Sequence, residues 1–341
     1  MLTLLSRVRS LTPTRGMVAQ GTPDGPSQLL GVPDELAIEI DANGSPVTIQ
    51  EAHWFICFVP GLQRQWWHPF ANPRHKHVFA LRMIDDHTWL LVEPWWTRLM
   101  VNVLTLDEAV KFLRWGAAGD ILQVREAIPG RGSQVRGWSN CTVLVSFLLG
   151  RSYWTWTPHG LFRRLKADPG VKSVDLSRFL REHFESVANK TADEALKLLP
   201  GRSEEPLREV LLDLGTSVMA AALSPSAIAL HKVAISECGR FSDAADALWT
   251  FGPARAIDRI REVLEDARRR GEVRIDDCST AARQFVAMLR GDLHLEIIFG
   301  MRAAPSPGDI RNHVLSVVAV FLRGAWRNGR LRLLRVSNAA H

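Results

Sequence analysis

A cysteine, a histidine and a glutamate form the most chemically suggestive set in the chain. Cys141 follows Asn140 where an apolar run begins, which predicts that its thiol lies in the first turn of a helix. The positive end of the helix dipole stabilises a thiolate there, and a neighbouring histidine completes the activation. His77 and Glu93 lie in two β-rich runs separated by a turn, so strand pairing would bring them together. The set predicts a nucleophile, its base and a group that orients the base.

Each of the three also has a structural interpretation. Cys141 begins an apolar segment, and a buried cysteine with no chemical role fits that position equally well. His77 follows a run of polar residues and could simply mark the polar entry to a strand. Glu93 precedes a proline at a strand end, and Asp86 or His87 could orient the imidazole instead. These alternatives stay open at the level of sequence.

The cysteines offer no metal or disulfide pattern. They have no CxxC spacing, and none clusters with histidine as zinc ligands do. We therefore expect free thiols, no metal site and no cofactor. The chain has four cysteines, Cys57, Cys141, Cys238 and Cys278.

The elements expected around the cysteine and the histidine are two strands, a helix, a strand and a second helix. They span residues 77–84, 88–93, 105–115, 120–128 and 141–149. Thr105 and Glu108 form a capping box at the start of the first helix. A loop rich in glycine and arginine, residues 129–137, leads into the second. We therefore expect an α+β domain with a small antiparallel sheet.

Residues 50–165 resemble the circularly permuted papain-like fold, in which the histidine precedes the cysteine. The Asn140-Cys141 junction and the apolar helix after it are similar to the lecithin:retinol acyltransferase branch of that fold. The resemblance implies a cysteine-dependent hydrolase or acyltransferase acting on an amide or an acyl ester. Cys141 would be the nucleophile, His77 its base and Glu93 the orienting group.

The second half of the chain carries the longest helical signal. In residues 276–298 and again in 306–323, apolar residues recur at spacings of three and four, which predicts two amphipathic helices. Ser306 is placed to cap the second helix, and Pro307 occupies its first position, where the missing N–H costs nothing. Taken as periodicity, the pattern predicts a helical bundle.

Four phrases in this half resemble the C-terminal domain of TetR/AcrR-family transcriptional regulators, closest to the AefR-like subgroup. They are Leu223–His231, Phe251–Arg255, Ala281–Phe285 and Leu289–His294. The resemblance implies an all-helical domain over about residues 190–325, with an apolar pocket for a small effector. Its last two long helices would form a four-helix homodimer interface. The lining candidates are His231, Trp249, Phe285 and Met288.

A TetR-family repressor also carries a helix-turn-helix unit of about fifty residues before its sensor domain. Residues 180–186 are faintly similar to the end of such a unit. Residues 153–165 instead contain tryptophans and a Thr-Pro pair, with no two-helix pattern around a glycine turn. Sequence-specific DNA binding by this chain is therefore doubtful.

Composition indicates two unlike soluble domains. The chain has 341 residues, of which 46% are apolar and 23% charged, and ten of its twelve tryptophans precede residue 160. The longest apolar runs fall short of the ~20 residues of a membrane span, and no secretory signal is evident. We therefore expect a cytoplasmic protein. The net charge of +6 is concentrated in residues 323–335, which hold five arginines and no acid. This tail is either solvated or a phosphate-binding arm.

The expected organisation has five parts. A poorly ordered extension (1–49) precedes the α+β papain-like domain (50–165), a linker or remnant of a DNA-binding unit (166–189), the TetR-type ligand-binding and dimerisation domain (190–325) and the basic tail (326–341). The sequence thus predicts a regulatory protein that senses a small apolar ligand and forms a homodimer. The alternative function is that of the cysteine-dependent hydrolase or acyltransferase.

Overall fold

The computed structural model describes residues 51–62, 66–95, 98–127, 140–151, 153–197 and 205–326. The expected extension over residues 1–49, the glycine- and arginine-rich loop over 129–137 and the basic tail beyond residue 326 lie outside the described residues.

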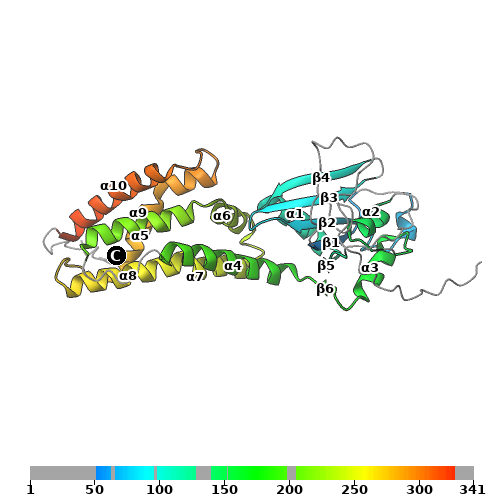
Figure 1. The fold of residues 1–341 in the computed structure, drawn as a ribbon, viewed down its shortest axis with the longest axis horizontal. Helices are drawn as coiled ribbons and strands as arrows, with labels where there is room; N and C mark the ends of the chain where they lie inside the picture. The colour runs from blue at the N-terminus through cyan, green and yellow to red at the C-terminus, as the bar shows by residue number, and fades with distance from the viewer. Residues whose placement is uncertain are drawn as a thin grey trace, which may run out of the picture. The chain divides into compact units, whose positions relative to one another are not determined.

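The first part of the described chain is built on an antiparallel sheet (Figure 1). The strands are β1 (His53–Val59), β2 (His77–Met83), β3 (Thr88–Pro94), β4 (Leu99–Thr105), β5 (Asp120–Arg125) and β6 (Lys172–Ser173). Their order across the described sheet is β4-β3-β2-β1-β5-β6. The hairpin expected around residues 85–87 is confirmed, because β2 and β3 pair with Ala80 opposite Val92.

Helices cover both faces of this sheet. Helix α1 (Leu106–Ala117) packs on one face, and helices α2 (Cys141–Leu148) and α3 (Pro158–Lys166) pack on the other. Side chains along a strand alternate between faces, so Phe79 and Leu81 contact the α1 side while Val78 and Ala80 contact the α2 side. The expected α+β class of this part of the chain, an antiparallel sheet with helices, is confirmed.

The turn between α1 and β5 requires a glycine. The carbonyl of Gly119 accepts a hydrogen bond from the guanidinium of Arg74. A Cβ built on Gly119 would lie 2.0 Å from the carbonyl oxygen of Phe58 and 2.8 Å from that of Arg74. Backbone atoms cannot move aside cheaply, so no larger residue fits. The turn therefore fixes the start of β5, where Asp120 lies.

Gly119→Ala should destabilise the protein by about 1–3 kcal/mol, the usual cost of overpacking a close contact. Urea denaturation followed by circular dichroism measures the change. Gly239→Ala is the matched control, because a Cβ at Gly239 would have no atom within 4 Å. Equal unfolding midpoints for the two variants would contradict the steric argument.

The remaining described elements are helices. They are α4 (Leu176–Lys197), α5 (Leu207–Ala222), α6 (Pro225–Glu237), α7 (Ser242–Phe251), α8 (Pro253–Arg269), α9 (Cys278–Ile298) and α10 (Pro307–Trp326). Helix α7 ends before Gly252, whose φ of −110° and ψ of −96° are not helical, and Pro253 begins α8, where its missing N–H costs nothing. Helix α4 runs without a break across the boundary expected between residues 189 and 190.

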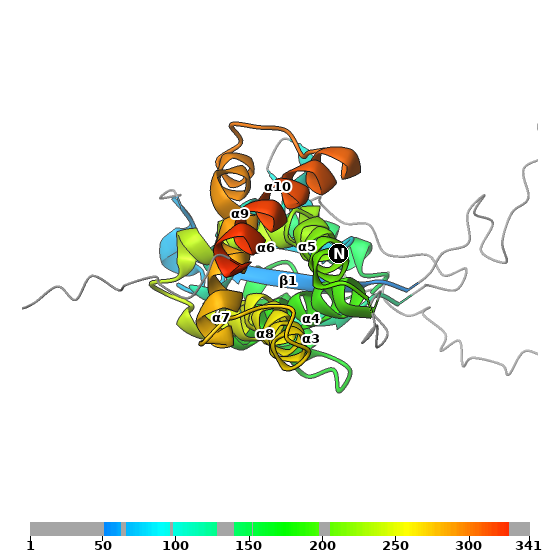
Figure 2. The ribbon, with the colours of Figure 1, turned by 90° about the vertical axis from the view of Figure 1, so that its left-hand side faces the viewer.

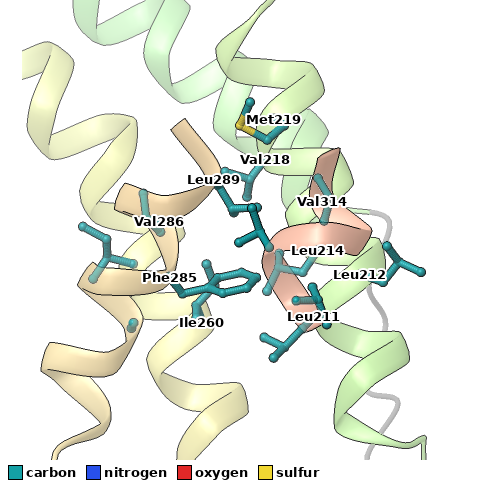
Figure 3. Close-up of a cluster of buried hydrophobic side chains, with 14 of the residues drawn as sticks. Leu211, Leu212, Leu214, Val218, Met219, Ile260, Phe285, Val286, Leu289 and Val314 are labelled. Atoms are coloured by element: carbon teal, nitrogen blue, oxygen red, sulfur yellow. The ribbon is translucent and has the colours of Figure 1, made fainter. Parts of the chain in front are cut away.

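The core of the helical part is formed by α5, α8, α9 and α10. Figure 3 shows Phe285 and Leu289 of α9 facing Ile260 of α8, Leu214 of α5 and Val314 of α10. Figure 2 shows α10 beside α9 and α5. The 3.6-residue period of the apolar positions thus places one stripe of each helix in a shared core.

None of the described helices is by itself long and apolar enough to cross a membrane. Helices α5 and α6 meet that criterion only as a pair, and they are bent by 63° at the break between them.

Candidate functional site

The start of α2 is fixed by Asn140. Its side-chain oxygen accepts a hydrogen bond from the backbone N–H of Val143 at 2.9 Å, and its amide nitrogen donates to the carbonyl of Trp156 at 3.0 Å. This cap makes Cys141 the first residue of the helix. Val145, fully buried one turn later, holds the helix against the sheet. The thiol therefore sits at the positive end of a helix dipole.

The hairpin brings His77 and Glu93 together. His77 begins β2, and Glu93 lies near the end of β3, on the strand that pairs with β2. The His77 Nε2 atom lies 3.6 Å from Glu93 Oε1, and their side chains are 19% and 4% exposed. This separation is that of an ion pair and is longer than a good hydrogen bond. The carboxylate is thus buried beside the imidazole it was predicted to orient.

Cys141 completes the group, because its thiol contacts the His77 imidazole and the backbone of Val78. Burial alone would raise the pKa of the Cys141 thiol, but the interaction with His77 outweighs it and the pKa is lowered. Burial alone would lower the pKa of His77, but Cys141 and Glu93 together raise it to about 9. Both shifts favour a thiolate–imidazolium pair.

Two tryptophans flank the imidazole. The ring centroid of Trp115 lies 6.1 Å from that of His77 with an interplanar angle of 25°, and that of Trp95 lies 6.0 Å away at 34°. The faces of indole rings attract cations, so this flank favours the protonated form of His77.

An open groove of about 1000 Å³ lies beside Glu93. Its lining includes Trp95, Phe112 and Trp115. Of the three residues of the cluster, Glu93 lines the groove, and Cys141 and His77 do not.

The alternative orienting residues are engaged elsewhere. Asp86 forms an ion pair with Lys190 at 3.1 Å, and its carbonyl oxygen lies 3.0 Å from His183 Nε2. His87 Nδ1 lies 3.0 Å from Asp85 Oδ1. Neither Asp86 nor His87 takes the place of Glu93 beside His77.

Sequence reasoning missed a second polar cluster next to the first. His75 is almost fully buried, with Nε2 2.8 Å from Asp120 Oδ2 and Nδ1 2.8 Å from His159 Nδ1. Burial lowers the pKa of His75, although Asp120 opposes the effect. The cluster links the residues just before β2 to β5 and α3, and so helps to position His77, the first residue of β2. Within the described residues, no group of three or more His, Cys, Asp or Glu side chains could hold a metal ion.

Glu93→Gln should slow alkylation of Cys141 about tenfold at pH 8 while leaving the fold intact. Losing the carboxylate removes one of the two partners that raise the pKa of His77, so the imidazolium is lost at lower pH. Mass-spectrometric rates with iodoacetamide measure the effect. Glu194→Gln, at an exposed position on α4, is the control. An unchanged rate in Glu93→Gln would show that the carboxylate does not act on the pair.

The candidate ligand residues of the helical part are scattered. His231 lines a cavity of about 80 Å³, together with Arg290 and a set of small apolar residues. Trp249 is about half exposed on α7. Phe285 lies in the bundle core against Phe321, with ring centroids 5.0 Å apart, and Met288 packs at the edge of that core. Of the four candidates, His231 alone lines this cavity.

Comparison with known protein families bears on these helices. Residues 209–324 match the family model described as AefR-like transcriptional repressor, C-terminal domain. These residues are therefore similar to the AefR-like C-terminal domain family. The matched segment, called the AefR-like domain below, begins within α5 and ends within α10. The resemblance seen in the sequence is confirmed, whereas no family match supports the papain-like likeness of residues 50–165.

Solved structures similar to the chain are TetR-family regulators of low sequence identity. A TetR-family regulator from Mesorhizobium loti has 18% identity and a TM-score of 0.41, covering 54% of this chain and 86% of its own. The flavonoid-responsive regulator FrrA has 22% identity and a TM-score of 0.38, covering 54% and 85%. A TetR regulator from Agrobacterium tumefaciens has 21% identity and a TM-score of 0.36, covering 54% and 82%. No curated protein gives a significant match.

Proposed function

We propose that the chain joins a thiol-dependent acyl hydrolase or acyltransferase to a ligand-sensing, dimerising AefR-like domain. One observation supports the enzymatic half of this proposal. Cys141 at a helix start lies together with His77 and Glu93, which come from two paired strands. The order of histidine before cysteine, with the cysteine beginning a helix packed on an antiparallel sheet, supports the resemblance to the permuted papain-like fold on which this half of the proposal draws.

The chemistry that this arrangement supports is acyl transfer through a thioester. The Cys141 thiolate attacks the carbonyl carbon of an amide or acyl ester, and the carbonyl electrons move to oxygen. When the tetrahedral intermediate collapses, the bond to the leaving amine or alcohol breaks and the His77 imidazolium supplies its proton. Water or a second nucleophile then attacks the thioester, gives its proton to His77 and releases Cys141. Glu93 stabilises the imidazolium throughout.

Hydrolysis of activated acyl esters and amides by the full-length protein tests this half. Activity should be lost on treatment with iodoacetamide and should survive a fluorophosphonate, which labels serine hydrolases. Inhibition by the fluorophosphonate, or resistance to iodoacetamide, would assign the activity to another nucleophile.

The regulatory half rests on the AefR-like domain and on the cavity that residues of this domain and of α4 line. The cavity combines a mostly apolar lining with two polar residues, His231 and Arg290, as ligand sites commonly do. We propose that a small ligand bound there alters the dimer formed by α9 and α10. In the described chain, α4 follows the sheet-based unit and precedes the AefR-like domain. We therefore favour control of the sheet-based unit, or of a protein partner, as the effect of ligand binding.

A further inference from the structure

Arg290 is a partly buried charge without a described counter-ion. It lies on α9, with Nη2 3.2 Å from His231 Nε2 and 3.3 Å from His294 Nδ1. Among the residues that the structure describes, no carboxylate forms an ion pair with it. Burial lowers the pKa of Arg290, and no acidic neighbour counters that effect. A charge withdrawn from water is costly unless something pairs with it.

The hydrogen bonds around Arg290 fix where the histidine protons lie. His231 Nδ1 is 2.8 Å from the carbonyl oxygen of Ala227, so Nδ1 carries the proton and Nε2 accepts from Arg290. His294 Nδ1 also faces the guanidinium and must accept, which leaves the His294 proton on Nε2. That Nε2–H group is buried without a partner, in a residue only 2% exposed.

Both imidazoles are neutral at pH 7. Burial lowers the pKa of His231, and burial together with Arg290 lowers that of His294 to about 3. The cluster therefore holds a single positive charge and one unused N–H donor. The positive charge of Arg290, which lines the cavity, is complementary to an anion, whereas His294 is not among the residues that line it.

The cavity next to this cluster is otherwise apolar. Arg290 and His231 line one part of its wall. Small side chains from α4, α5 and α8 line much of the remainder, including Ala188, Ala192, Ala195, Ala221 and Ala256. Helix α9 breaks at the next residue, Gly291, whose φ of 41° and ψ of −150° are not helical. The cavity thus has a cationic end and an apolar body.

We infer that this cavity binds a small organic carboxylate, whose charged group pairs with Arg290 and whose apolar body lies among the alanines. The inference rests on the proposed sensing function and names the chemical class of its ligand. A single charge beside neutral histidines suits a monovalent carboxylate. The volume of about 80 Å³ suits a short body, because a cavity of ~150 Å³ accommodates benzene.

Calorimetric titration of the full-length protein tests this inference. The probes are propionate and butyrate, each paired with its neutral isostere, propionamide or butyramide. At least one carboxylate should bind ten times more tightly than its amide. Arg290→Met should weaken carboxylate binding at least tenfold and leave amide binding unchanged. Arg283→Met removes an exposed charge from the same helix and should match the wild type.

The possible results distinguish the inference that the cavity recognises an anion from the proposal that it senses a small ligand. Amides that bind as tightly as carboxylates, or carboxylate binding retained in Arg290→Met, would overturn anion recognition and leave a neutral ligand site standing. Absence of binding by all four probes would overturn both claims for this cavity. If Arg290→Met fails to fold, Arg290→Gln keeps donors without the charge and must show the same loss. Ala192→Leu, which fills the cavity, should abolish binding of acids and amides alike.

Discussion

At pH 6, Cys141 is expected to react with iodoacetamide at least ten times faster than Cys238. Accessibility alone predicts the reverse, because Cys238 is exposed and Cys141 is partly buried. A thiol with the ordinary pKa of about 8.5 is only about 0.3% thiolate at pH 6. The lowered pKa of Cys141 beside His77 gives it a much larger thiolate fraction. Cys57 and Cys278 are buried, and burial raises the pKa of both thiols.

The pH dependence of Cys141 alkylation follows from the opposite pKa shifts of Cys141 and His77. The pKa of Cys141 is lowered, so its thiolate persists below the pH at which an ordinary thiol protonates. The pKa of His77 is raised to about 9, so the imidazolium persists up to that pH. Alkylation of Cys141 should therefore begin at a lower pH than that of an ordinary thiol, and its rate should change again as the pH rises through about 9. The stability that protonated His77 contributes is full below pH ~6.5 and is lost as the pH rises through 9.

Cys141→Ala should reduce acyl hydrolysis at least a thousandfold, because the proposed nucleophile is removed and none of the other three cysteines lies beside His77. His77→Ala should slow alkylation of Cys141 at pH 6 toward the rate at Cys238. Cys238→Ala is the matched control and should leave turnover unchanged. Equal alkylation rates at all four cysteines, or a Cys141 that reacts only after denaturation, would reduce this cluster to a structural role.

Leu295→Glu combined with Val320→Glu is expected to convert a dimer to a monomer. Leu295 on α9 and Val320 on α10 are 47% and 56% exposed, and Phe299 just beyond α9 is 66% exposed. If these helices form the proposed interface, each glutamate would place a charge in an apolar contact. We expect the dissociation constant to rise at least a hundredfold. Light scattering should give twice the 38.2 kDa chain mass for the wild type and a single chain mass for the variant.

Ile235→Glu is the control for this experiment. Ile235 is also 56% exposed but lies on α6, so the charge should leave the dimer intact. Val317 is unsuitable for the test, because it is 8% exposed within the bundle core and a glutamate there would unfold the protein. A wild-type protein that is monomeric at micromolar concentration would overturn the proposed interface.

Val317 also illustrates what periodicity can and cannot predict. The repeat of apolar residues in 306–323 correctly predicts a helix with one buried stripe. It does not say whether that stripe is covered by the same chain or by a second copy. In the structure Val314, Val317 and Val318 face the chain's own core, and the outward face carries Val320. The difference depends on the packing of distant helices, which a local pattern does not encode.

The candidate sites also combine features that a local sequence pattern predicts with features that depend on distant residues. The cap at Asn140 and the turn over 85–87 are local signals, and they place Cys141 at a helix start and His77 and Glu93 on paired strands. The cluster of His75 with Asp120 and His159 joins residues up to 84 positions apart and has no local signal. Arg290 likewise falls away from the apolar stripe of α9, and its partner His231 on α6 lies 59 positions away in the sequence.

The tryptophan stacked near His77 gives the site an optical readout. Indole emission is quenched by contact with a protonated imidazole more strongly than by a neutral one. Because Trp115 lies nearly parallel to His77 with centroids 6.1 Å apart, part of the protein's fluorescence should brighten as the pH rises through 9. Light emitted by Trp115 would therefore report the charge state of the Cys141–His77 pair in solution, without substrate and without chemical labelling.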